Sequence, residues 1–226
     1  MEATMCGRFT LTSNPEQLQE SFPGILITHE VSPRYNIAPS QPIAVIPNSD
    51  QTRLDYYTWG LVPHWAKDPS IGSRLINARS ETLDEKPAFR TAYRRRRCLI
   101  LADGFFEWMS TPGTRSKTPM LIKLKSGNPF AFAGLWEVWN SPDGSTLKTC
   151  CIITTQPNSL MAPIHNRMPV ILPSEAYTLW LDPLEISPST VNPLLVPYNP
   201  DEMIAFPVSR EVNNPQYDNQ VCVQPL

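Results

Sequence analysis

Short apolar runs separated by polar turns predict a fold made mainly of strands. The continuous apolar stretches at residues 42–47 and 98–102 are typical of buried strands. Three longer runs, at residues 120–125, 130–139 and 148–155, predict a strand meander, and the turn SPDG between the last two predicts a hairpin. A late strand is expected at residues 203–208.

Helical signals are fewer and short. Asn14 before a proline predicts a helix start, with Leu18 and Phe22 on one face. A second short helix is expected to begin at Ser174, as its cap, and to stop at Asp182. Several strands with a few short helices, and no linker, repeat or shift in composition, indicate one α+β domain.

A further helix is expected between Pro87 and the arginine run 94–97, with Phe89, Ala92 and Tyr93 turned inward. Cationic residues are favoured at a helix C-terminus by its dipole, so the run is explained equally well as a solvated helix end or as a phosphate-binding group. The sequence leaves these two interpretations open.

Composition narrows the class of protein. The chain has 226 residues, enough to bury a sizeable core, and it contains 25 prolines, nine glycines and five cysteines. It lacks an apolar run of about 18 residues and the apolar core of a signal peptide, so we expect no membrane span and an intracellular location. An odd number of irregularly spaced cysteines favours a reducing compartment. The net charge of −2 excludes a highly basic nucleic-acid binder, although a local arginine-lined face remains possible.

Three segments carry residues suited to chemistry. In ADGFFEW, Glu107 is flanked by aromatic residues, and an apolar setting raises the pKa of a carboxyl toward values useful for acid–base catalysis. In PIHNRMPVIL, His165 lies between prolines beside Arg167. In INARSE, Asn77 and Arg79 point the same way if the segment is extended. Each residue can equally be structural: a surface glutamate, a structural histidine or a turn asparagine.

The cysteines divide into two kinds. Cys150 and Cys151 lie in an apolar strand and face opposite sides, so we interpret them as buried structural residues. Cys6 follows Met5 directly. If the mature chain begins at Cys6, that residue carries an α-amine and a thiol. Together with His165 and Asn77, its thiol would also be compatible with a thiol peptidase.

Seven motifs, taken in order, resemble one family over nearly the whole chain: the SRAP family, named for SOS-response-associated peptidase. They are MCGRF (5–9), YNIAP (35–39), WGLVPHWA (59–66), INARSET (76–82), RRCLILADGFFEW (96–108), FAGLWE (132–137) and IHNRMPVIL (164–172). Phosphate loops, zinc pairs and dinucleotide fingerprints are absent, and no metal or cofactor is expected.

The resemblance implies a single SRAP domain over residues 6–226, with a barrel-like core of twisted antiparallel strands and short peripheral helices. It implies a function in the DNA damage response, in which the protein shields abasic sites in single-stranded DNA. The cysteine amine would condense with the sugar aldehyde to a Schiff base, and the thiol would close a thiazolidine ring. An α-amine, with a pKa of about 7.7–8.0, is partly neutral near pH 7.

The resemblance also assigns roles to individual residues. Cys6 would be the nucleophile, Asn77 would position it, Glu107 would shuttle protons and His165 would promote opening of the sugar. Arg8, Arg79 and Arg167 would hold phosphates, and Trp65 would pack against bases. The expected partner is single-stranded DNA with abasic sites. We expect a monomer in the cytoplasm, nucleoid-associated in a bacterium, or in the nucleus of a eukaryote.

One departure from the family pattern is that residues 1–5 precede the cysteine. In a chain that keeps them, the Cys6 nitrogen is an amide and forms no Schiff base. We therefore expect translation to start at Met5, or cleavage, to free Cys6. Two other functions stay open: a thiol or self-cleaving peptidase, and a non-covalent binder of single-stranded DNA. Strand cleavage by β-elimination would be compatible with the covalent chemistry.

Overall fold

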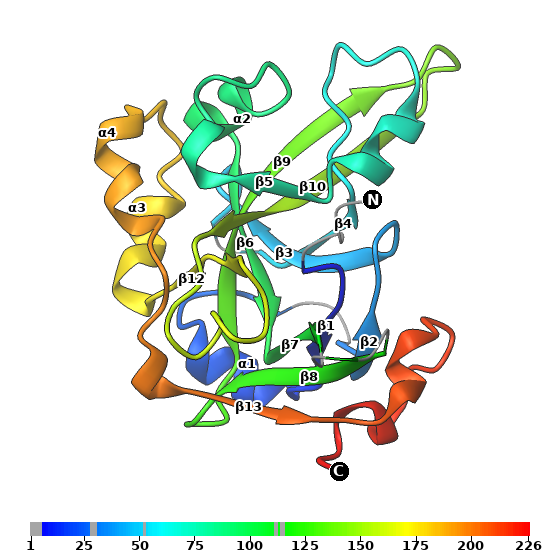
Figure 1. Ribbon diagram of the computed structural model, residues 1–226. Helices are drawn as coiled ribbons and strands as arrows, with labels where there is room; N and C mark the ends of the chain where they lie inside the picture. Colours follow the sequence, from blue (N-terminus) through cyan, green and yellow to red (C-terminus); the bar gives the residue numbers. More distant parts are fainter. Residues whose placement is uncertain (1–5, 28–30, 52, 111–112, 114–115) are drawn as a thin grey trace.

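The computed structural model describes residues 6–27, 31–51, 53–110, 113 and 116–226. Two sheets form the molecule, and short helices lie at its periphery (Figure 1). The expected helix at residue 14, with its Asn14 cap, is confirmed. The side chain of Asn14 accepts a hydrogen bond from Gln17 N, and the Gln17 side chain accepts one from Asn14 N. Leu18 and Phe22 are buried, as predicted.

Five strands close into a barrel: β3 (Pro42–Pro47), β4 (Asp55–Trp59), β10 (Thr146–Thr155), β9 (Phe130–Asn140) and β6 (Arg97–Ala102). Each pairs with the next in this order, and β6 pairs with β3 to complete the ring. The pairing of β10 with β4 is parallel, so the barrel is not wholly antiparallel. Three short strands extend it: β5 (Asn77–Arg79), β11 (Met168–Pro169) and β12 (Ile171–Leu172).

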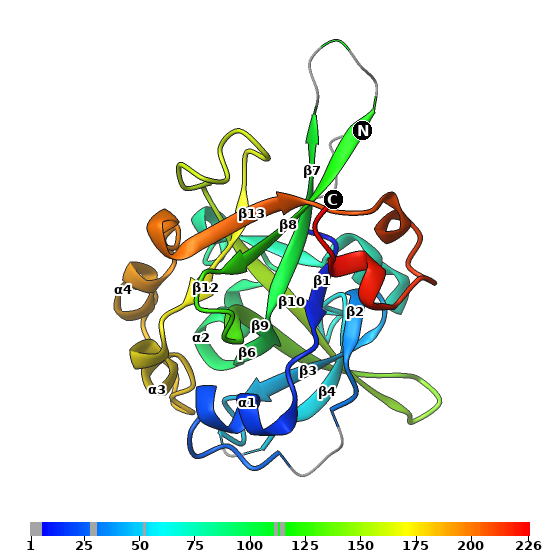
Figure 2. The same cartoon turned by 90° about the horizontal axis from the view of Figure 1, so that it is seen from below.

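The second sheet has the order β13-β8-β7-β1-β2. Its strands are β1 (Phe9–Leu11), β2 (Arg34–Ile37), β7 (Gly104–Ser110), β8 (Lys117–Leu124) and β13 (Met203–Pro207). The paired ends of β7 and β8 project beyond the body of the molecule (Figure 2). The predicted meander was wrong in one respect. The strand at residues 120–125 belongs to this sheet, between β7 and β13, whereas β9 and β10 form the expected hairpin in the barrel.

The helices are short. The α-helices are α1 (Pro15–Ser21), α2 (Arg90–Arg95), α3 (Tyr177–Trp180) and α4 (Pro188–Val191). The 3-10 helices are η1 (Pro69–Arg74), η2 (Ser80–Thr82), η3 (Ser174–Ala176), η4 (Asn192–Leu194), η5 (Pro200–Glu202), η6 (Arg210–Asn213) and η7 (Gln220–Val223). Ser174 is not a side-chain cap, contrary to expectation. It begins a 3-10 turn after Pro173, and α3 follows.

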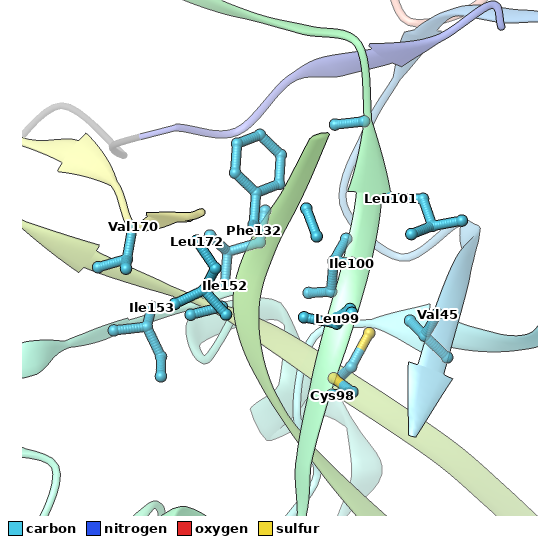
Figure 3. Packing of buried hydrophobic residues seen from close by; sticks show 14 of the residues in the cluster. Val45, Cys98, Leu99, Ile100, Leu101, Phe132, Ile152, Ile153, Val170 and Leu172 are labelled. Carbon is cyan, nitrogen blue, oxygen red and sulfur yellow. The ribbon is translucent and has the colours of Figure 1, made fainter. Parts of the chain in front are cut away.

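The apolar core fills the barrel and the space between the two sheets. Side chains of β3, β6, β9 and β10 pack together, with Val170 and Leu172 beside them (Figure 3). The interior is tight at Gly134. A Cβ there would lie 2.7 Å from Ile100 Cδ1 and 2.8 Å from Cys98 Sγ. Cys150 and Cys151 are both fully buried, and no group of metal-binding side chains exists among the described residues. In the same part of the chain, no helix has the length and apolar character needed to cross a membrane.

The arginine run at the end of α2 is neither simply solvated nor free to bind phosphate. Arg94 and Arg95 are exposed and paired with Asp84 and Glu185. Arg97 is fully buried, and its guanidinium donates to backbone carbonyl groups, among them Trp180 O at 2.9 Å. The solvated-end interpretation therefore holds only for the first part of the run.

Candidate functional site

Cys6 lies beside the carboxyl of Glu107. Strand β1 pairs antiparallel with β7, with Phe9 opposite Phe105, and this register brings the segment before β1 alongside the middle of β7. The Cys6 nitrogen donates a hydrogen bond of 2.6 Å to Glu107 Oε1. Cys6 is buried and has a positive φ of 32°, a conformation rare for residues other than glycine. The nitrogen and thiol of Cys6 are thus held next to one carboxyl group.

Glu107 has the environment that its aromatic neighbours predict. The residue is 3% exposed, and burial raises the pKa of the carboxyl from 4.5 to about 7. Hydrogen bonds from the backbone N–H groups of Cys6 and Trp108 oppose this shift, because they favour the ionised form. A carboxyl with a pKa near 7 is present in both protonation states at neutral pH, so it can both donate and accept a proton.

The thiol of Cys6 is protonated in this setting. Burial raises its pKa well above the ordinary value, and the nearby Glu107 charge acts in the same direction. A thiol with a raised pKa supplies little thiolate. The group available at Cys6 is therefore a neutral thiol whose proton must be removed during any reaction.

Asn77 completes the contacts around Cys6. It lies in β5 and its side-chain nitrogen donates to the Cys6 carbonyl at 3.4 Å. Strand β5 runs parallel to β10, with Asn77 opposite Ile152 and Arg79 opposite Thr154. Ala78 is buried, whereas Arg79 is exposed on the side of the strand that Asn77 shares, as the extended interpretation predicted.

His165 and Arg167 join this region through β10. Thr154 lies opposite Arg79 on one side and Pro169 on the other. The guanidinium of Arg167 donates to Thr154 O at 2.7 Å, and the backbone N–H of Arg167 donates to His165 Nδ1 at 3.2 Å. His165 is half-buried, and burial lowers the pKa of its ring.

Lys117 on β8 is a residue that the sequence gave no reason to select. Its charge lowers the pKa of Glu107 and also that of His165. Both groups therefore lie within the electrostatic reach of one ammonium group. No hydrogen bond joins His165 to Cys6 among the described residues.

The expected phosphate-binding arginines differ in their surroundings. Arg8 donates to Asn36 Oδ1 at 2.7 Å and to the carbonyl of Val212, lies over the Trp108 ring at 5.9 Å, and has its pKa lowered by burial. Arg167 is bound to Glu81. Within the part of the chain that the structure describes, the Arg79 side chain forms no hydrogen bond or ion pair. Their role in phosphate binding stays a prediction, and Arg79 is the one best placed for it.

Trp65 stands on a firmly attached loop. The residue is 52% exposed. The loop is held on both sides of it: Trp139 Nε1 donates to Ala66 O at 2.7 Å, and His64 Nδ1 lies 3.3 Å from Glu137 Oε2. An exposed indole on a fixed backbone is suited to stacking against a planar group at low entropic cost.

Asp103 and Asn36, which no sequence pattern singled out, fix segments around the site through hydrogen bonds. Asp103 is buried, and its carboxylate accepts hydrogen bonds from the backbone N–H of Thr12 and from that of Ser13, the latter at 2.9 Å. Asn36 donates to Tyr217 O at 2.7 Å. Both residues stand in the quoted motifs, but no local pattern indicates partners about ninety or more positions away.

Comparison with known proteins identifies the family and the fold. The family model described as SOS response associated peptidase (SRAP) matches residues 5–215. The abasic site processing protein YoqW of Bacillus subtilis is 49% identical over 223 residues, covering 97% of this chain and 99% of the relative. The abasic site processing protein HMCES of Mus musculus is 35% identical over 196 residues, 74% of this chain and 55% of HMCES. A crystal structure of a protein from Bacteroides thetaiotaomicron superposes with a TM-score of 0.85 at 25% identity, covering 98% of this chain and all of that one.

Proposed function

This chain belongs to the SRAP family, and from that premise we propose that it captures abasic sites in single-stranded DNA through a covalent bond to Cys6. The observation that carries the proposal is the 2.6 Å contact between the Cys6 nitrogen and Glu107, a carboxyl whose pKa burial raises to about 7 in the chain that keeps residues 1–5. In a chain that begins at Cys6, this nitrogen is an α-amine. The amine then faces an acid–base group suited to condensation with an aldehyde.

Cys6 and Glu107 supply every nucleophile and proton acceptor or donor that the reaction needs. The neutral amine adds to the C1′ aldehyde of the ring-opened sugar, and Glu107 in its acid form protonates the hydroxyl that leaves as water. The resulting C=N bond is attacked by the Cys6 sulfur, and the thiol proton passes to the Glu107 carboxylate. The product is a thiazolidine, formed from protein and DNA with loss of one water. Because the thiol pKa is raised, the proton acceptor beside it is needed for ring closure.

Asn77, His165 and Arg79 support this chemistry in the proposal. Asn77 fixes the Cys6 carbonyl and thereby the direction of the nitrogen. His165 acts on the closed sugar, and exposed Arg79 at the end of β5 binds a flanking phosphate. Trp65 provides a stacking surface that is indifferent to base identity. A protein that acts on lesions in any sequence needs contacts of this kind.

A thiol peptidase is less well supported by the geometry. Such an enzyme needs thiolate, whereas burial and the Glu107 charge both raise the pKa of the Cys6 thiol. The histidine also makes no described hydrogen bond with Cys6. The carboxyl instead contacts the nitrogen, which is the atom that a peptidase nucleophile does not use and that the Schiff-base reaction requires.

Intact mass spectrometry tests the proposal. Two forms are compared, one beginning at Cys6 and one retaining residues 1–5, each with single-stranded DNA that carries one abasic site. We expect only the first to gain the mass of the DNA less one water. A Cys6→Ser variant with a free N-terminus should give an imine that is detected only after borohydride reduction. The matched control Cys222→Ser, a change at another buried thiol, should crosslink normally. Absence of an adduct with free Cys6 would refute the proposal.

A further inference from the structure

The loop of residues 60–66 is attached to the segment that leads into β5. The backbone N–H of Leu61 donates to Leu75 O at 3.1 Å. Strand β5 begins two residues later, at Asn77, whose side chain contacts the Cys6 carbonyl. The backbone of this loop is therefore tied to the strand that carries one of the groups beside Cys6.

His64 is the exposed neighbour of Trp65 in this loop, and it is held by one edge of its ring. Its side chain is 58% exposed, whereas that of Glu137, whose Oε2 lies 3.3 Å from His64 Nδ1, is only 7% exposed. The same carboxylate oxygen accepts a hydrogen bond of 2.7 Å from Arg96 Nη2. Among the described residues, none forms a hydrogen bond with His64 Nε2. One ring nitrogen is thus engaged by a largely buried ion pair, and the other is available to a ligand.

The contact with Glu137 determines which nitrogen of His64 carries the proton. A carboxylate in an ion pair with Arg96 can only accept, so Nδ1 must be the donor. In the neutral ring Nε2 is then an acceptor without a proton, and it cannot bind a phosphate oxygen, which also only accepts. In the imidazolium ion Nε2 can donate to a phosphate while Nδ1 keeps its contact with Glu137. Phosphate binding by His64 therefore requires the uptake of one proton.

The charged groups around His64 come from three parts of the chain. Glu137 lies in β9 and Arg96 follows the last turn of α2. Lys67 and Asp68 follow in the same loop, where the Asp68 side chain caps η1. A histidine ordinarily changes its charge between about pH 5 and pH 8. The requirement for a proton can therefore be tested in a pH range that proteins tolerate.

We propose that His64 is a phosphate ligand for single-stranded DNA that binds only as the imidazolium ion, with Nδ1 held by Glu137 and Nε2 donating to a phosphate beside the base that stacks on Trp65. This inference rests on the DNA binding of the proposed function and not on its covalent step. It adds to Arg79 a second phosphate contact, one that depends on pH. Because binding takes up a proton, affinity falls as the pH rises through the range in which the free ring loses its proton.

Fluorescence anisotropy with a labelled oligothymidylate that has no abasic site tests the inference. The full-length protein is titrated at pH 6 and pH 8 over a range of salt concentrations. The wild type should bind roughly twofold to fivefold more tightly at pH 6, the worth of one exposed ionic contact, and its slope of log K against log salt should be steeper there by about 0.7. His64→Gln should lose both differences, and His64→Lys, which keeps a positive charge, should show the steeper slope at both pH values. The matched control Lys148→Gln removes an exposed cation paired with Asp55 and should behave as the wild type.

Two results would overturn the inference. If His64→Gln keeps the pH dependence and the slopes of the wild type, the proton is taken up by another group. If His64→Gln and His64→Lys weaken binding equally at both pH values, His64 only supports the loop. Crosslinking of an abasic strand by the form that begins at Cys6 is measured in parallel. A crosslink without any effect of His64 on binding refutes this inference alone, whereas absence of the crosslink refutes the proposed function.

Discussion

Ionisation of Glu107 should destabilise the folded chain that retains residues 1–5. Glu107 is 3% exposed, and burial raises the pKa of its carboxyl from 4.5 to about 7. Below pH 4.5 the folded and unfolded chains both bind the proton. Between the two pKa values the unfolded chain releases the proton while the folded chain holds it, so stability falls as the pH rises. Above pH 7 the loss is complete and constant.

The size of this effect follows from the pKa difference. At 1.36 kcal/mol per unit, raising the pKa from 4.5 to about 7 corresponds to about 3 kcal/mol of lost stability at alkaline pH. Between pH 5 and pH 8 most of that loss, about 2 to 3 kcal/mol, should be observable. Such a change is a large fraction of the 5–15 kcal/mol (roughly) by which folded domains are stable.

Urea unfolding of the wild type and Glu107→Gln at pH 5 and pH 8 measures the effect. Glutamine keeps the shape of the side chain and an acceptor for the Cys6 N–H but does not ionise. From pH 5 to pH 8 the free energy of unfolding of the wild type should therefore fall by about 2 to 3 kcal/mol relative to that of Glu107→Gln, at unchanged m-value. A difference between the two proteins that is the same at both pH values would refute a raised Glu107 pKa. In a chain that begins at Cys6, the α-ammonium should lower the carboxyl pKa and reduce this pH dependence.

Three further outcomes are expected. Gly134→Ala should destabilise the protein by about 1–3 kcal/mol in urea unfolding, because the added methyl would lie 2.7 Å from Ile100 and the barrel has no free space there. Arg79→Ala should weaken binding to single-stranded DNA and reduce the slope of log K against log salt by about 0.7, the value for one lost phosphate contact; an unchanged slope would remove Arg79 from the interface. Trp139→Phe removes the indole N–H that holds the Trp65 loop, so affinity for DNA should fall, while the crosslinking rate at saturating DNA stays the same.

Helices and strands that are marked by a short sequence pattern were predictable from the sequence. The strands with which they pair were not. Asn14 with the following proline predicts α1 because the capping contacts span only three residues. The apolar run 98–102 predicts β6 for a similar reason. The position of β8 was missed, because an apolar run states that a strand is buried but not which sheet it joins. Ser174 carries a capping side chain, yet the chain there forms a 3-10 turn that leaves the cap unused.

The candidate site shows the same limit. Aromatic neighbours predicted the buried setting of Glu107, because burial of a short apolar segment is a local property. The pairing of Glu81 with Arg167 joins residues 86 positions apart, and no spacing in the sequence indicates it. The Met5-Cys6 pair predicted chemistry at Cys6, which stays a prediction, and the contact of the Cys6 nitrogen with Glu107 depends on the register of β1 against β7.

The distribution of charge bears on how abasic DNA would be recognised. The chain has a net charge of −2, and two of the three arginines expected at the DNA, Arg8 and Arg167, already bind protein groups. If these two stay bound to the protein, Arg79 is the one of the three that can neutralise a phosphate, and for single strands the salt dependence scales as about 0.7 per phosphate. Undamaged DNA would be bound weakly and released quickly. Under the proposed function, selectivity must arise at the reaction step, because only a strand with an aldehyde can become bonded to Cys6. Under the proposed function, weak and short-lived binding to undamaged DNA, followed by an irreversible or slowly reversed bond at an abasic site, would let the protein sample many sites without remaining bound to them.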